Sequence, residues 1–182
     1  MRAHGLLPPL HGEGRRSGAK PGWGASGHTD PTLTAARSSL PIKGRESVVV
    51  IQGYASLWGI ADLNGDVVAQ GAFADSLARS GAAGVKMLNQ HEARSTVGVW
   101  DALVEDERGL FVRGRIMDWS PEARFAGALS RAGALDGLSI GFRAVKARRD
   151  GRLRVLSAVE LWEVSLVTFP MLPGARFRVM GE

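Results

Sequence analysis

Three side chains in this sequence have the types needed for acyl-transfer chemistry. His91 follows Leu88-Asn89-Gln90 at the end of a predicted strand, Ser139 stands between two glycines, and Glu163 lies inside an apolar strand. A serine hydroxyl becomes a nucleophile when a histidine accepts its proton, and a carboxylate can orient that histidine. The chain order His, Ser, Glu is compatible with this chemistry, because a triad depends on geometry and not on order.

The distribution of histidines limits the chemistry further. The sequence has four, namely His4, His11, His28 and His91, and three of them precede residue 47. A metal site built from several histidines is therefore not expected, and we predict no metal and no cofactor. Acid–base or nucleophilic chemistry at His91 is the interpretation that remains. The alternative is a polar loop residue at the end of a strand.

Ser139 occupies the segment Gly137-Leu-Ser-Ile-Gly-Phe142. Strand alternation places Leu138, Ile140 and Phe142 on one face and Ser139 on the other. If the large apolar residues fill the core, Ser139 points outward. The two flanking glycines then leave room for another backbone to approach closely. This setting suits a nucleophile with a peptide substrate, and a tight bend or bulge is the alternative.

Glu163 shares a face of its strand with Leu161, Ser165 and Val167. An ionised carboxylate in so apolar a strand is costly unless it is paired. A histidine is a natural partner, and an arginine is the alternative. Ser165 lies about 6.8 Å further along the strand, which makes it either a rival nucleophile or a supporting hydrogen-bond donor.

Composition excludes several classes of protein. The 182 residues contain no cysteine, so disulfide scaffolds, thiol nucleophiles and thiolate metal sites are ruled out. No apolar run approaches the roughly 18 to 20 residues that span a bilayer, and no membrane is expected as a partner. The segment 22–27 matches the dinucleotide pattern GxGxxG, but no predicted strand precedes it and no helix follows it. We interpret that match as chance.

The chain divides into a leader and one domain. Residues 1–46 hold five of the eight prolines and seven Lys/Arg against three acids, a net charge of +4. This composition predicts a disordered basic leader. Residues 47–182 carry 16 Lys/Arg and 15 Asp/Glu, so the high isoelectric point describes the leader more than the domain. Specific nucleic-acid binding is therefore not expected.

Periodicity and turn signals in residues 47–182 predict a mainly β fold with a few helices. Hairpins dominate, separated by turns such as Asn64-Gly65, 105–108 and Asp150-Gly151. We predict six or seven strands in a closed or nearly closed, mostly antiparallel barrel. The strands are expected at 48–58, 85–88, 97–104, 109–116, 138–146 and 152–168, with helices at 71–79, ended by Ser80-Gly81, and at 121–132.

Residues 47–180 resemble the prohead maturation proteases of tailed bacteriophages. The resemblance lies in short segments whose order and spacing extend over about 130 residues, and the leader has no counterpart in it. The segments are Gly53-Tyr-Ala-Ser56, Asn64-Gly-Asp66, Gly71-Ala-Phe73, Leu88-Asn-Gln-His91 with Gly98, Glu105-Asp-Glu-Arg-Gly-Leu110, Gly137-Leu-Ser-Ile-Gly-Phe142, and Glu163-Val-Ser-Leu-Val167 ahead of Pro170 and Ala175.

The resemblance implies a fold and a set of roles. The family is related to the herpesvirus assembly protease, assemblin, a mostly antiparallel barrel of about seven strands. By this resemblance His91 is the general base, Ser139 the nucleophile and Glu163 the third member, a place that the herpesvirus enzymes fill with a second histidine. Family members cleave the scaffold or the scaffolding segment of the capsid protein, and often themselves, inside procapsids in the bacterial cytoplasm. The same resemblance implies capsid or scaffold protein as partner, with a homo-oligomer as one assembly state.

Three further expectations concern roles that the residues leave open. The oxyanion donors are expected to be backbone amides or an arginine, and the loop 171–176, which follows the Glu163 strand, is a candidate source. Self-cleavage would give the leader a role as a removable or tethering segment. The alternatives to a protease are a catalytically inactive capsid-assembly or scaffold component and a barrel that binds nucleic acid through the leader and Trp23.

Overall fold

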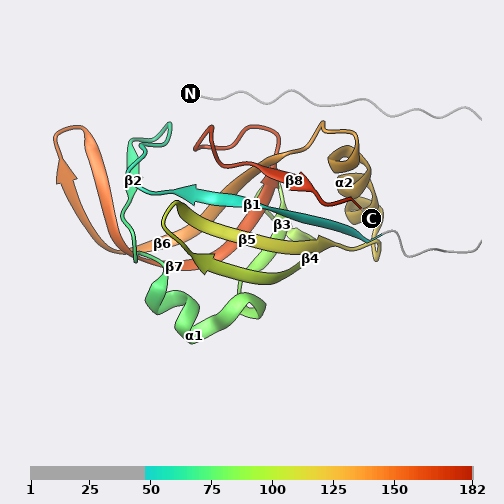
Figure 1. Cartoon of the computed structure of the whole chain (residues 1–182), viewed down its shortest axis with the longest axis horizontal. Coiled ribbons are helices and arrows are strands. Elements are labelled where there is room, and N and C mark those ends of the chain that lie inside the picture. Colours follow the sequence, from blue (N-terminus) through green and yellow to red (C-terminus); the bar gives the residue numbers. More distant parts are fainter. Residues whose placement is uncertain (1–47, 182) are drawn as a thin grey trace, which may run out of the picture. The chain divides into compact units, whose positions relative to one another are not determined.

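The computed structural model describes residues 48–181, so the predicted leader and the GxGxxG match at 22–27 lie outside the described residues. Eight strands and two helices make up the described part of the chain (Figure 1). In chain order they are β1 (Val49–Leu57), β2 (Asp66–Val68), α1 (Ala74–Gly84), β3 (Lys86–Asn89), β4 (Glu92–Glu105), β5 (Gly109–Ile116), α2 (Pro121–Arg131), β6 (Gly137–Asp150), β7 (Leu153–Val167) and β8 (Phe177–Val179).

The strands form one curled sheet that stays open, so the prediction of six or seven strands in a closed or nearly closed barrel is wrong in its closure. The strand order is β2-β7-β3-β4-β5-β1-β8, with β6 paired to β7. Two of the pairings, β2 with β7 and β3 with β7, are parallel, and the others are antiparallel. The predicted mainly β class is confirmed, but the sheet is an open half-barrel.

Strand β7 is the element on which the site depends, because β6 follows one of its edges and β2 and β3 follow the other in succession. Between β2 and β3 this edge has a gap, which α1 and the turn before it fill. There the Val159 amide donates to the Ala72 carbonyl and the Leu161 amide donates to Ser76 Oγ, both at 2.9 Å. The buried backbone groups of β7 are thus satisfied without a strand.

Both predicted helices are present, with one difference in extent. Helix α1 begins at Ala74 and continues past Ser80 to Gly84, with a left-handed Gly81 (φ 58°) inside it. The predicted stop at Ser80-Gly81 coincides with this break, and a second short helical segment follows it to Gly84. Helix α2 agrees with the prediction, since Ser120 Oγ caps it by accepting from the Ala123 amide at 3.1 Å.

The core lies on the concave side of the sheet. Its largest fully buried side chains come from six of the strands and from the segments before α1 and after α2, and they are Phe73, Ile51, Met87, Leu110, Ile116, Leu135, Leu138, Leu156, Leu166, Val97, Val112 and Val159. Alternation along β6 and β7 therefore sends Leu138 and Leu166 into the core and the candidate residues to the other face. Neither helix within residues 48–181 has the length and apolarity needed to cross a membrane.

Candidate active site

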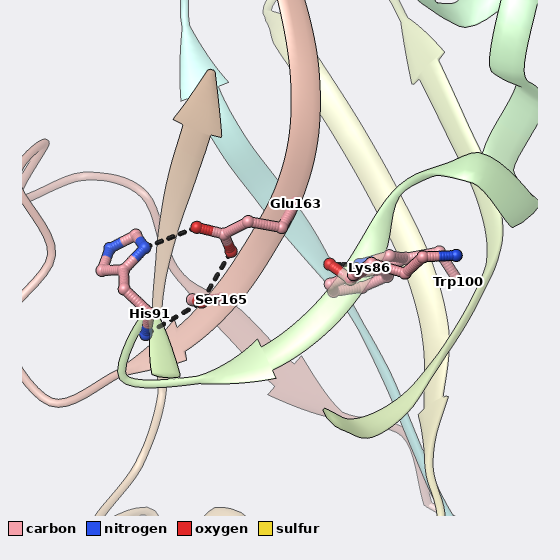
Figure 2. A network of polar contacts seen from close by, with 5 residues as sticks. All are labelled: Lys86, His91, Trp100, Glu163 and Ser165. Atoms are coloured by element: carbon pink, nitrogen blue, oxygen red, sulfur yellow. Dashed lines mark hydrogen bonds and ion pairs between the residues drawn. The ribbon is translucent and has the colours of Figure 1, made fainter. Parts of the chain in front are cut away.

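The imidazole of His91 and the carboxylate of Glu163 form a direct ion pair, as the sequence predicted. His91 lies just beyond the end of β3 and Glu163 lies on β7, and Nδ1 is 2.6 Å from Oε1 (Figure 2). The Glu163 side chain is 12% exposed and the His91 side chain 43%. An ionised carboxylate only accepts hydrogen bonds, so Nδ1 carries the proton and Nε2 is the nitrogen left for another partner.

The backbone at His91 is held in an unusual conformation that aims the ring at β7. Gln90 and His91 both have positive φ, 53° and 60°, although neither is glycine. Such residues persist where the surrounding structure determines them. Here the Gln90 amide donates to the Leu166 carbonyl at 2.9 Å, and the Gln90 side-chain amide donates to Thr168 Oγ1 at 2.9 Å. Sequence reasoning missed the Gln90–Thr168 contact, which carries no local signal.

Ser165 joins the two members of the ion pair to each other. Its hydroxyl donates to Glu163 Oε2 at 2.6 Å and accepts from the His91 main-chain amide at 3.1 Å (Figure 2). The side chain is fully buried, with 0% exposed. Of the two interpretations that the sequence left open, this geometry favours the supporting donor, because the hydroxyl is already committed to both neighbours.

The carboxylate of Glu163 lies directly over Gly141. These two residues are paired across β6 and β7, and a Cβ added at Gly141 would be 2.1 Å from Glu163 Oε1. The sequence predicted that this glycine leaves room for an approaching substrate backbone. That interpretation is wrong, because the space is filled by the protein's own carboxylate.

Ser139 lies on the same face of the sheet as Glu163. It pairs with Ser165 across β6 and β7, which places their Cβ atoms about 4.5–5.5 Å apart. It faces away from the core as predicted, yet it is only 6% exposed. Within residues 48–181 no direct hydrogen bond joins Ser139 to His91. Hydrogen bonds of this kind often tighten only when substrate is bound. The two residues are linked through Ser165 on β7, which is the register partner of Ser139 and accepts from the His91 amide.

A cavity of about 210 Å³ opens beside Ser139. Its walls come from β6 (138–140 and 142), β1, β2 with the loop before it, the start of β7 and the loop after β7. The lining is polar and apolar in nearly equal parts: its apolar residues include Ile60, Phe142 and Met171, and Asp66 and Arg154 form an ion pair on one side. The cavity brings the predicted loop 171–176 next to Ser139, because Met171 and Leu172 both line it.

The pairing with Glu163 changes the pKa of His91. The hydrogen bond to Glu163 raises the pKa of His91 above its usual value of 6.5, and it outweighs the partial burial of the ring, which lowers the pKa. The carboxylate charge adds to the rise. In a reaction that makes His91 a proton acceptor, the same carboxylate stabilises the imidazolium that forms.

Strand β3 is itself fixed at its start, so the position of His91 is set from both ends of that strand. The Trp100 indole on β4 donates to the Lys86 carbonyl at 3.4 Å (Figure 2). Met87, between Lys86 and the site, is fully buried in the core.

Among the described residues, no three His, Asp or Glu side chains gather into a group that could hold a metal ion.

Comparison with known proteins agrees with this geometry. Residues 37–182 match the family described as caudovirus prohead serine protease. The prohead protease of Enterobacteria phage HK97 is 31% identical over 144 residues, which cover 76% of this chain. The chain spans 63% of the length of that relative. This chain belongs to the caudovirus prohead serine protease family.

Solved structures share the fold at low sequence identity. The bacteriophage T4 capsid assembly protease matches with a TM-score of 0.54 and 13% identity, over 65% of this chain and 80% of that one. A KSHV protease, determined with a hexapeptide phosphonate inhibitor, matches with a TM-score of 0.50 and 15% identity, over 74% of this chain and 66% of that one. The predicted likeness to herpesvirus assembly proteases is thus confirmed for the fold.

The pKa of His91 tests the ion pair directly. We expect NMR titration of the full chain to show that the imidazole signal missing from His91→Asn has a pKa above 6.5. In Glu163→Gln the neutral amide no longer stabilises the imidazolium, so this pKa should fall. A Glu92→Gln control, which changes an exposed carboxylate next to His91, should leave it raised. An unchanged pKa in Glu163→Gln would contradict the pairing.

A second prediction follows from the space that Gly141, which has no side chain, leaves for the Glu163 carboxylate. In Gly141→Ala the new methyl carbon would lie 2.1 Å from Glu163 Oε1, which is too close for both atoms to stay in place. Glu163 must then leave its bonds to His91 and Ser165, and the His91 pKa should fall as in Glu163→Gln. Gly181→Ala, where open space surrounds the glycine, is the matched control. If a folded Gly141→Ala protein kept the raised pKa of His91, the space at Gly141 would not be needed for the ion pair.

Proposed function

We propose that this chain is a serine endopeptidase of the Ser-His-Glu type that acts in procapsid maturation. Ser139 is the nucleophile, His91 the general base and Glu163 the group that orients His91. The observation that carries the proposal is the hydrogen bond between His91 Nδ1 and the mostly buried Glu163 carboxylate. Glu163 lies on β7, and on the same strand Ser165 is the register partner of Ser139 on β6. Family membership supports the reaction class.

The mechanism follows from the proton positions. His91 Nε2 accepts the Ser139 proton as Oγ attacks the scissile carbonyl, which forms a C–O bond and an oxyanion. The imidazolium then gives that proton to the leaving amine, and the C–N bond breaks. Water attacks the resulting acyl-enzyme by the same proton route and releases the acid. Glu163 keeps the proton on Nδ1 throughout and stabilises the transient imidazolium.

Stabilisation of the oxyanion is assigned to backbone amides of the loop 171–176. Two of its residues, Met171 and Leu172, line the cavity that contains Ser139. The loop is held in place by the Leu138 amide, which donates to the Ala175 carbonyl at 2.9 Å. Because Leu138 precedes Ser139, this bond fixes the loop relative to the nucleophile. Amide donors aimed at a developing oxyanion contribute a large part of the transition-state stabilisation in acyl transfer.

The substrate assigned to the chain is a capsid-assembly polypeptide, the scaffold or the scaffolding segment of the capsid protein. Support comes from the relatives, one a prohead protease and one a capsid assembly protease. The site of action is then the procapsid in the bacterial host. Cleavage of the chain itself belongs to the same proposal, with the leader as its product.

Replacement of the nucleophile tests the proposal. We expect wild-type protein to be labelled by a fluorophosphonate and to cleave its capsid precursor, while Ser139→Ala does neither and loses at least about 10³-fold in rate. Mass spectrometry should show a shortened chain for wild type and the intact chain for Ser139→Ala. Ser157→Ala, at an exposed serine away from the site, is the control. Normal cleavage by Ser139→Ala would favour the inactive assembly component and overturn the proposal.

A separate prediction concerns Ser165, which holds Glu163 and the His91 amide in place and is not the nucleophile in this proposal. In Ser165→Ala the Glu163 carboxylate and the His91 amide each lose a partner, so kcat should fall about 10- to 100-fold with little change in KM. Fluorophosphonate should still label the protein at Ser139, which peptide mapping would verify. Ser165→Thr keeps the hydroxyl and should restore most of kcat. Labelling at Ser165 would instead make it the nucleophile.

A further inference from the structure

Strands β6 and β7 continue beyond the rest of the sheet as a two-stranded ribbon (Figure 1). Every residue from Arg143 to Arg154 is exposed, and we call this segment the basic ribbon. Its own side chains are not part of the core, although the β6 residues 143–148 pair with β7 residues 155–160, among which Leu156 and Val159 are buried. Only the end around the turn extends past β2, and a two-stranded end of this kind is marginally stable in water. The exposed side chains of the basic ribbon therefore call for a reason outside the core.

Positive charge is concentrated in the basic ribbon. Its charged residues are six cations against one acid, a net of +5, and they are Arg143, Lys146, Arg148, Arg149, Asp150, Arg152 and Arg154. The other residues of 48–181 carry ten Lys/Arg against thirteen Asp/Glu, a net of −3. A charge this segregated attracts a partner of opposite sign to one part of the molecule.

The arrangement of these cations also lowers the stability of the ribbon. Arg149 pairs with Arg154 across the two strands, and like charges directly opposite each other are unfavourable. Arg154 is compensated by Asp66 on β2, and Arg148 by Asp150 next to the turn. For Lys146, Arg149 and Arg152 the described part of the chain supplies no ion pair. Local conflicts of this kind are typical of surfaces kept for function.

The geometry points to an acidic polypeptide as the ligand of the basic ribbon: we propose that it is a docking surface for an acidic segment of the protein substrate. The proposal rests on the function proposed above. The reason to favour polypeptide over nucleic acid is continuity, since β6 and β7 carry Ser139 and Glu163 at one end and the ribbon at the other. A chain bound along the ribbon is therefore directed toward the nucleophile.

The spacing predicts where the acidic segment lies in the substrate. Lys146 and Arg149 are seven and ten residues beyond Ser139 on β6, or about 23 and 33 Å at the rise of a strand. An extended substrate covers these distances in about 7 to 10 residues. Exposed Val145, at 53%, adds an apolar contact beside the charges. The acidic segment should lie about that far from the scissile bond.

The test measures binding apart from catalysis. Full-length Ser139→Ala protein is titrated with fluorescein-labelled poly-L-glutamate, and the ribbon variant adds Lys146→Glu, Arg149→Glu and Arg152→Glu. The control variant adds Arg94→Glu, Arg113→Glu and Arg178→Glu, three exposed arginines outside the ribbon with the same total charge change. We expect binding to weaken at least about tenfold in the ribbon variant and much less in the control. Added salt should weaken wild-type binding.

Equal losses in the two variants would overturn the proposal, because net charge alone would then explain binding. Tighter binding of duplex DNA than of poly-L-glutamate, lost in the ribbon variant, would also overturn it in favour of a nucleic-acid surface. Fluorophosphonate labelling of Ser139 in the active forms of both variants shows whether the site is intact. Absence of labelling in the wild type would count against the proposed function and leave the binding result to be judged by itself.

Discussion

The structure of the site follows from one constraint, which is that the carboxylate of Glu163 must be satisfied inside an apolar strand. Leaving an ionised group unpaired there would cost several kcal/mol or force it to take up a proton. Both oxygens have a partner, since Oε1 accepts from His91 and Oε2 accepts from Ser165. The side chain also needs space, which Gly141 provides. A network of this kind is stable only when every member is present.

The same constraint explains why the loop after β3 adopts a costly conformation. Left-handed backbone at Gln90 and His91 is unfavourable for residues with a Cβ. The hydrogen bonds to Ser165 and Leu166 on β7 and to Thr168 just after it offset that cost. The loop therefore depends on β7 for its shape, and Glu163 depends on the loop for its partner. The ion pair and the loop conformation stabilise each other.

Much of this site is predictable from the sequence because its causes are local. Strand alternation puts Glu163 and Ser165 on one face, and the cost of an unpaired carboxylate requires a partner such as His91. The remaining parts are tertiary. No property of Gln90 indicates that its side chain bonds Thr168, and the glycine in Gly137-Leu-Ser-Ile-Gly-Phe142 signals a close approach without saying by what. The identity of the approaching atom is set by the register of β6 on β7.

The fold shows the same division between local and tertiary causes. Hairpins such as β4–β5 and β6–β7 are predictable because the turn lies between the strands it joins. The parallel additions of β2 and β3 to β7 are not, since each pairs segments far apart in the sequence. The closed barrel was expected on the assumption that neighbours in sequence are neighbours in the sheet. Two short strands and a helix sharing one edge of β7 break that assumption.

The β6–β7 ladder couples the two functional regions that this structure suggests. Its inner half is largely buried and carries the site, while the outer part of β6 and the turn are exposed and carry the basic ribbon. The exposed half could not stay ordered by itself, but it continues a ladder whose register is set by buried residues. The ribbon thus keeps a fixed distance and direction from Ser139. A ligand that orders the ribbon acts on the same two strands that hold Glu163 over Gly141, so binding and chemistry share one rigid support.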